Sequence, residues 1–79
     1  MKKVSKLELR KASERSSTIL AEWVRAQRLK NELTQGDLAK LAGVDRKTVN
    51  RIENYAFSPS VNTVTRLSVV MDAPIPELV

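Results

Sequence analysis

Residues 35–54 read QGDLAKLAGVDRKTVNRIEN, and the rest of the chain is organised around this stretch. Apolar residues at helical spacing lie on both sides of Gly43: Leu38, Ala39 and Ala42 before it, and Val49 and Ile52 after it. Gly43 follows the first run, where a helix end favours a residue that tolerates positive φ. Asp45 comes soon after and can accept hydrogen bonds from the free N–H groups of a new helix. A helix that ends and restarts so quickly must turn sharply, which predicts a helix-turn-helix.

The sequence before this stretch predicts a helix from about Thr18 to Lys30, with Thr18 or alternatively Ser17 as its N-cap. Its inward stripe is expected to consist of Leu20, Val24, Gln27 and Leu29. Trp23 falls outside that stripe. We interpret it as an aromatic at the edge of the core, or as a contact for the N-terminal segment or a partner chain.

Capping residues delimit the helices that follow. Thr34 is expected to cap a helix ending near Ala42, with Asp37 completing a capping box. The next helix should run from Asp45 to about Asn54. Ser60 should cap a later helix that ends near Met71, whose inward residues would be Val61, Val64, Leu67 and Val70 or Met71.

The ordered residues of this region resemble the Cro/CI phage-repressor type, or Xre-type, helix-turn-helix family over about residues 20–79. The residues that match at the family's spacing are Arg28, Leu33-Thr34-Gln35, Leu38-Ala39, Gly43-Val44, Val49, Ile52-Glu53, Pro59-Ser60, Thr63 and Leu67. The resemblance implies an all-α, compact five-helix domain over residues 18–79, with its helix-turn-helix at 35–54 and residues 74–79 as a truncated last helix. It also implies a partly buried ion pair between Arg28 and Glu53.

The chain departs from the family pattern at two positions. Gly36 stands in the first turn of a predicted helix, where the family prefers a helix former and glycine costs about 1 kcal/mol relative to alanine. Tyr55 stands where the family usually has glycine, so Asn54 or Tyr55 must take the backbone conformation of that glycine. We expect Asn54 to take it, because asparagine tolerates the left-handed region better. Tyr55 and Phe57 are expected to cover the core or to line a dimer interface.

The resemblance makes residues 45–54 the recognition helix, with an outward face rich in hydrogen-bond donors. Arginine can donate two parallel bonds to guanine, and asparagine can pair with adenine in the major groove. The resemblance also implies that Gln35 binds a phosphate and braces the start of this helix, and a helix N-terminus favours a phosphate in itself. The expected DNA-binding residues are therefore Gln35, Arg46, Lys47, Thr48, Asn50 and Arg51.

Composition limits the other possibilities. The chain of 79 residues fits one domain with a small core, and it has no cysteine and no histidine. The usual imidazole base, zinc ligands and thiolate nucleophile are therefore missing, so we expect no enzyme, no cofactor and no metal. No apolar run approaches the roughly 20 residues of a membrane span, which favours a cytoplasmic protein.

The formal net charge of +5 is concentrated near the N-terminus. Residues 1–17 carry six basic and two acidic side chains, a net charge of +4, so the other residues contribute only +1. This basic N-terminal extension is expected to be a disordered terminus, a DNA-binding arm or a short extra helix. The candidate arm residues are Lys2, Lys3, Lys6, Arg10 and Lys11.

The leading hypothesis is a transcriptional regulator, such as a repressor, that binds double-stranded DNA as a homodimer. Its operator would be an inverted repeat, with helix 45–54 in the major groove. Dimer candidates are the apolar C-terminal residues Ile75, Leu78 and Val79. The alternative is an antitoxin-type protein-interaction module that binds a partner protein as well as its own promoter. Its partner surface would be residues 1–17, Trp23 and the C-terminal tail.

Overall fold

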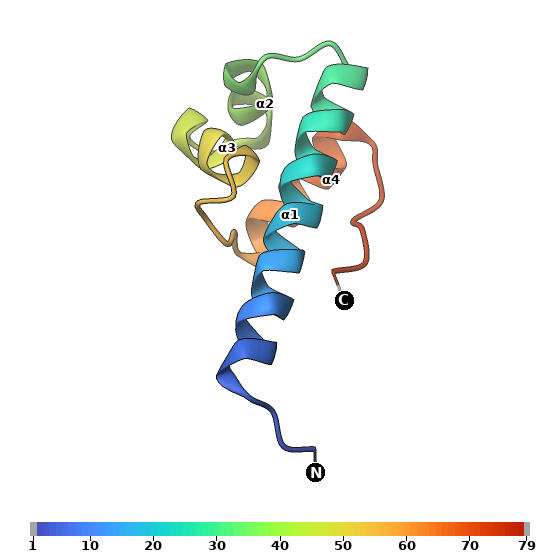
Figure 1. Ribbon diagram of the computed structural model, residues 1–79. Helices are drawn as coiled ribbons and strands as arrows, with labels where there is room; N and C mark the ends of the chain where they lie inside the picture. Colours follow the sequence, from blue (N-terminus) through green and yellow to red (C-terminus); the bar gives the residue numbers. More distant parts are fainter. Residues whose placement is uncertain (1, 79) are drawn as a thin grey trace.

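The computed structural model describes residues 2–78, and this range contains four α-helices and no strand (Figure 1). Their bounds are α1 Lys6–Lys30, α2 Gln35–Ala42, α3 Arg46–Glu53 and α4 Val61–Met71. The predicted all-α class is confirmed. No helix within residues 2–78 has both the length and the apolar character needed to cross a membrane.

The first helix begins at Lys6, so the predicted start at Thr18 is wrong. Ser5 is the N-cap, and its hydroxyl accepts a hydrogen bond of 3.1 Å from the backbone N–H of Glu8. The hydroxyl of Thr18, the expected cap, instead donates to the carbonyl of Glu14 at 2.9 Å. This bond to the carbonyl one turn back lets a threonine lie inside a helix. The segment expected to be separate is therefore the first half of one continuous helix.

The fifth helix expected over residues 74–79 is also wrong for its described part, because residues 73–78 are not helical. Pro74 and Pro76 lack a backbone N–H, and each disfavours helical backbone in the residue before it. The tail instead runs back beside α1, as Figure 1 shows. The hydroxyl of Ser16 donates to the carbonyl of Leu78 at 3.0 Å, which fastens the end of the described tail to α1.

The core lies where α1, α2, α3 and α4 meet. α3 packs against α1 and α2, and α4 packs against α2 and α1. The most deeply buried large side chains are Leu38, Ile52, Leu67, Met71, Val24 and Val49. The predicted inward residues of α2 and α3 are thus confirmed, as are Leu20 and Val24 of α1.

Three predicted orientations in α1 and α4 differ from the structure. Trp23 is buried in the core cluster, whereas Leu29 is 55% exposed. Trp23 precedes Val24 and lies within the wide apolar face that a core helix buries, whereas Leu29 lies five residues after Val24, on another side of the helix. Val61 was expected to face inward but is 83% exposed, because it begins α4 at the rim of the core. The partner-contact interpretation of Trp23 is therefore wrong.

A buried ion pair joins α1 to α3, as predicted. Arg28 Nε lies 2.8 Å from Glu53 Oε2, and a second guanidinium nitrogen lies 2.9 Å from Glu53 Oε1. A third bond of 2.9 Å runs from Arg28 to the carbonyl of Leu33, at the end of the α1–α2 connection. The hydrogen bond to Glu53 raises the pKa of Arg28 above its ordinary value, although burial opposes the shift. This bidentate pair sets the position of α3 on the scaffold.

Candidate nucleic-acid interface

The N-terminus of α2 is closed by the predicted capping box. The backbone N–H of Asp37 donates to the Thr34 hydroxyl, and the backbone N–H of Thr34 donates to the Asp37 carboxylate, both at 3.0 Å. The backbone hydrogen bond from Thr34 holds the pKa of Asp37 below its usual value. The box fixes the first turn of α2, where Gln35 is the first helical residue.

The turn between α2 and α3 depends on Gly43, whose φ of +70° confirms the prediction of positive φ. The backbone N–H of Val44 closes the turn with a 3.0 Å bond to the carbonyl of Ala39. Arg66 of α4 reaches this turn, and its guanidinium donates to the carbonyls of Ala42 and Gly43 at 3.3 and 3.4 Å. This role of Arg66 is not predictable from the sequence pattern. The only signal for it is a basic residue in a helix of otherwise uncharged residues.

The start and the end of α3 both differ from the prediction. Asp45 has the extended backbone of an N-cap, but its carboxylate makes no capping hydrogen bond within the described residues. At the other end, Tyr55 has a φ of +63° while Asn54 has a φ of −97°. The left-handed residue is therefore Tyr55, and the expectation for Asn54 is wrong. Asn54 instead uses its side-chain amide to donate to the carbonyl of Asn50 at 2.9 Å.

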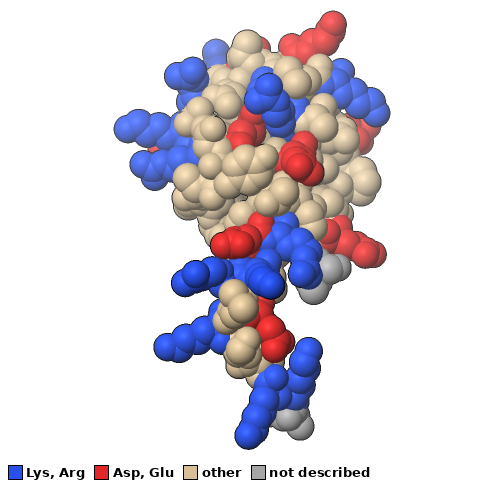
Figure 2. Space-filling model, in the orientation of Figure 1, with Lys and Arg blue, Asp and Glu red and all other residues tan. Residues whose placement is uncertain are grey.

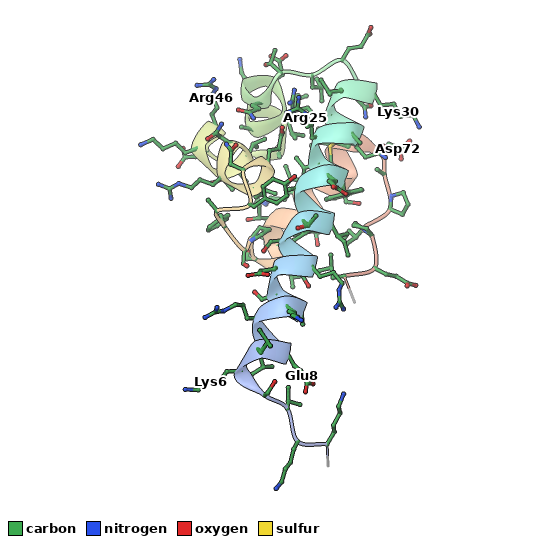
Figure 3. All side chains as sticks on the ribbon, viewed as in Figure 1. Lys6, Glu8, Arg25, Lys30, Arg46 and Asp72 are labelled. Carbon is green, nitrogen blue, oxygen red and sulfur yellow. The ribbon has the colours of Figure 1, made fainter. Side chains whose placement is uncertain are left out.

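The two sides of α3 differ sharply in burial. Val49, Ile52 and Glu53 are buried, and Thr48 is half-buried at the border. The exposed side carries four side chains with N–H donors, three of them cationic: Arg46, Lys47, Asn50 and Arg51. Figure 3 shows Arg46 reaching away from the domain. This side can donate hydrogen bonds to base edges or to phosphates.

Gln35 and Asn50 connect the two helices of the motif. The Asn50 side-chain amide donates to Gln35 Oε1 at 3.2 Å, so Gln35 contacts the middle of α3, whereas the expected brace was to its first residues. The bond uses one of the two N–H groups of Asn50 and leaves its amide oxygen available. Those two remaining groups are the ones that a bidentate contact with adenine requires. A hollow of about 220 Å³ lies between Asn50, Arg46 and Lys47.

The remaining predicted site residues lie elsewhere. Among the candidate arm residues, Lys6, Arg10 and Lys11 lie on the exposed first half of α1, and Lys2 and Lys3 precede it. Of the dimer candidates, Ile75 is 45% exposed and Leu78 is half-buried against the core. Val79 lies outside the described residues. Ile75 and Leu78 help to line an apolar hollow of about 150 Å³, whose other walls are Leu20, Pro59, Val61 and Val64.

The two aromatic residues that follow α3 are not part of the buried core. Tyr55 is 55% exposed and Phe57 is 38% exposed. Tyr55 borders a hollow on the side of α1 that is also lined by Ser17 and Thr18. The chain has no histidine or cysteine, and no group of three acidic side chains within residues 2–78 could hold a metal ion. The interface therefore offers hydrogen-bond donors and positive charge.

Comparison with known proteins agrees with this geometry. A family model described as helix-turn-helix (HTH_3) matches residues 24–78, which include all of α2, α3 and α4. Searches among curated proteins and solved structures found no significant match. The matched family is a DNA-binding family without enzymatic activity. This chain belongs to the Cro/CI-type, or Xre-type, helix-turn-helix family.

Proposed function

We propose that this protein is a sequence-specific transcriptional regulator that binds an inverted-repeat operator as a homodimer, with α3 in the major groove. The observation that carries the proposal is the composition of the exposed side of α3. Four adjacent side chains there carry N–H donors, while the opposite side is buried in the domain. Such a helix can enter the groove without exposing the core, and its N-terminal residues approach the base edges.

Arg46, Asn50 and Arg51 are the residues that we expect to read sequence. Each arginine can bind guanine through two parallel hydrogen bonds, which discriminates against other bases by about 1–3 kcal/mol. Asn50 is held by Gln35, so its free oxygen and N–H already have a defined orientation for adenine. Lys47 and Thr48 would add contacts at the edges of this face, and Gln35 would hold a phosphate through its side-chain amide.

A homodimer is expected because one such helix reads only a short sequence. Two copies related by two-fold symmetry would place their α3 helices about 34 Å apart, one turn of DNA. The apolar hollow that includes Ile75 and Leu78 supports this part of the proposal, because Val61 and Ile75 at its rim are 83% and 45% exposed. Contact with a second copy would remove this apolar surface from water.

Footprinting on the DNA upstream of the gene tests the proposal. We expect a protected inverted repeat whose half-sites are about 10 base pairs apart, centre to centre. Arg46→Ala and Arg51→Ala should each weaken binding to this site by about 1–3 kcal/mol and relax its specificity.

Lys30→Ala is the matched control, because it also removes one positive charge but lies on the opposite side of the molecule from Arg46 (Figure 3). If the arginine variants lose equal affinity for the protected site and for random DNA, those arginines contact phosphates and do not read bases. Absence of protection by the wild-type protein would contradict the operator.

The antitoxin-type alternative needs a partner-protein surface. One of its three expected parts, Trp23, is buried and unavailable. The first half of α1 and the C-terminal tail remain exposed in part. Co-purification from the native host distinguishes the two functions. A stoichiometric second protein bound to the wild-type chain would favour the alternative, which also binds its own promoter, whereas a protected inverted repeat without any such protein would favour the regulator.

A further inference from the structure

The first half of α1 extends beyond the helix-turn-helix domain as a free helix. We call residues 6–15 the stem, and every residue of the stem is exposed. Figure 1 shows the stem leading away from the other three helices, and the described chain measures 43 Å along its longest axis against 22 and 19 Å across. Ten helical residues span about 15 Å. A segment of this length has no core to join within residues 2–78.

The direction of the stem is nevertheless fixed by the structure. Its last residue is followed by Ser16, whose hydroxyl donates to the carbonyls of Ala12 and Leu78 at 3.1 and 3.0 Å. Leu20, one turn further along the same helix, is buried in the core. The stem is therefore an extension of a helix that is anchored in the domain, and it differs from a flexible arm.

The charges of the stem are not those that stabilise an isolated helix. The N-terminus of a helix favours acidic side chains, because the unsatisfied N–H groups carry partial positive charge. Here Lys2, Lys3 and Lys6 lie at that end, and Glu8 is the one acidic side chain in the first turn. Between residues 2 and 78 only two salt bridges form, Lys2–Glu8 at 3.7 Å and Arg28–Glu53. The basic side chains outnumber the acidic ones, and such an excess attracts ligands of negative charge.

One side of the stem faces the same way as the exposed side of α3. Lys6 and Arg46 reach out on the same side of the molecule in Figure 3. Arg10 is rotated from Lys6 by only about 40° around the helix, whereas Lys11 and Arg15 are rotated by about 140° and 180°. Figure 2 shows Lys and Arg side chains along the left edge of both the domain and the stem. Lys6 and Arg10 thus form a strip that continues the donor face of α3.

We propose that the stem is a preformed phosphate-binding strut, whose Lys6 and Arg10 contact the DNA backbone beside the sequence read by α3. This inference rests on the proposed DNA-binding function of α3. Residues 2–15 carry six basic and two acidic side chains, so they would repel a second copy of the same segment and attract a polyanion. About 15 Å of stem matches roughly four steps of a DNA strand.

The test compares three variants on a random-sequence duplex and on the operator duplex defined by footprinting. Each phosphate contact contributes about 0.9 to the slope of log K against log salt. Lys6→Gln/Arg10→Gln should therefore reduce the slope by about 1.8 on both duplexes. Lys11→Gln/Arg15→Gln removes the same charge from the other side of the stem and should leave the slope nearly unchanged.

The third variant, Ala12→Pro, keeps every charge and interrupts the helix between Arg10 and the domain. Proline removes a helical hydrogen bond and clashes with the preceding turn. If the contacts depend on the rigid helix, this variant should lose the same slope as Lys6→Gln/Arg10→Gln. Its melting curve should stay close to that of the wild type, because the core begins at Leu20.

Each other outcome overturns the inference. Equal slope losses for the two double variants would mean that net charge alone matters, and an unchanged slope in Ala12→Pro would mean a flexible arm. Unchanged slopes in all variants would mean that the stem does not contact DNA. If the proposed operator binding itself is wrong, the result differs from all of these, because the wild-type protein would then protect no inverted repeat.

Discussion

Replacement of Arg28 by methionine should destabilise the domain more than any other single change of a charged residue. The substitution keeps much of the side-chain length but removes both donors from the Glu53 carboxylate, whose side chain is 3% exposed. A buried carboxylate without a partner costs about 3–5 kcal/mol. A small domain has a total unfolding free energy of about 0.05–0.15 kcal/mol per residue, or roughly 4–12 kcal/mol for this length. The variant should therefore lose a large share of the stability of the domain, from about a quarter to nearly all of it.

The double variant Arg28→Met/Glu53→Leu should recover most of that loss. Replacing both members of a buried pair by apolar residues is often neutral, because the cost of desolvating two charges disappears with them. One cost remains, since the carbonyl of Leu33 loses its 2.9 Å bond from Arg28. A lost hydrogen bond of this kind is worth about 1 kcal/mol. We expect the double variant to lie within about 2 kcal/mol of the wild type.

Urea unfolding followed by far-ultraviolet circular dichroism measures these differences through the midpoint and the slope of the transition. Lys30→Met is the matched control, because it removes an exposed cation from the same helix and should change stability by less than about 0.5 kcal/mol. A loss below about 1 kcal/mol for Arg28→Met would refute the reasoning about the stranded carboxylate. So would a double variant that is less stable than either single variant.

Three further changes test local features. Tyr55→Gly should raise the free energy of unfolding by about 1 kcal/mol, since left-handed backbone costs a residue with a side chain about that much; a lower melting temperature would show that the ring contributes more than the strain costs. Gly36→Ala should stabilise α2 by about 0.5–1 kcal/mol. The new Cβ would lie 3.8 Å from Arg46 and from Thr34, in ordinary contact. Weaker DNA binding in this variant would indicate a phosphate close to Gly36. Asp37→Asn should remove a part of the stability that the domain loses at acidic pH. The pKa of Asp37 is lower in the folded state, so its carboxylate stabilises the domain fully above the unfolded-state pKa of about 3.9. This stabilisation is lost as the pH falls through the folded-state pKa. The melting temperatures of the wild type and of Asp37→Asn should therefore converge as the pH is lowered to strongly acidic values. Melting temperatures that fall in parallel with pH would contradict this role of the carboxylate.

The helix-turn-helix could be predicted because its determinants are local. The capping box of Thr34 and Asp37, the positive φ of Gly43 and the capping hydroxyl of Ser60 each depend on residues within one turn. The periodic apolar residues of α2 and α3 then fix which side faces the core. The Arg28–Glu53 pair is not local, and it was predicted only through the family resemblance.

The start of α1 could not be located in the same way. Ser5 and Thr18 are both acceptable caps by residue type, and the choice between them depends on hydroxyl bonds inside the helix. Ser16 and Thr18 use their hydroxyls to bind the carbonyls of Ala12 and Glu14, so neither interrupts the helix. The contact of Ser16 with Leu78 joins residues far apart in the sequence, so no local sequence pattern predicts it.

The ends of the helices are also only partly predictable from the sequence. All four end with a residue in the left-handed region, at Glu32, Gly43, Tyr55 and Asp72. At each end the following N–H bonds a carbonyl five residues back, as Leu33 does to Arg28 and Ala56 does to Arg51. Only one of the four is a glycine, the residue that signals such an end in a sequence. Three helix ends therefore take left-handed backbone without the glycine that would have announced them in the sequence.

The distribution of charge connects this scaffold to its proposed task. Residues 18–79 contribute only +1 to the net charge, so attraction to DNA by the folded domain depends on a few placed cations. α3 supplies three of them on one exposed side, whereas buried Arg28 binds Glu53 and exposed Arg66 binds the carbonyl of Ala42. The remaining excess of positive charge lies on the stem, with a net charge of +2, and on Lys2 and Lys3 just before it. If the stem is an extension of the rigid helix, its phosphate contacts and the base contacts of α3 are made in one fixed register. The stem would then orient α3 in the groove, whereas a flexible arm of equal charge could only increase affinity.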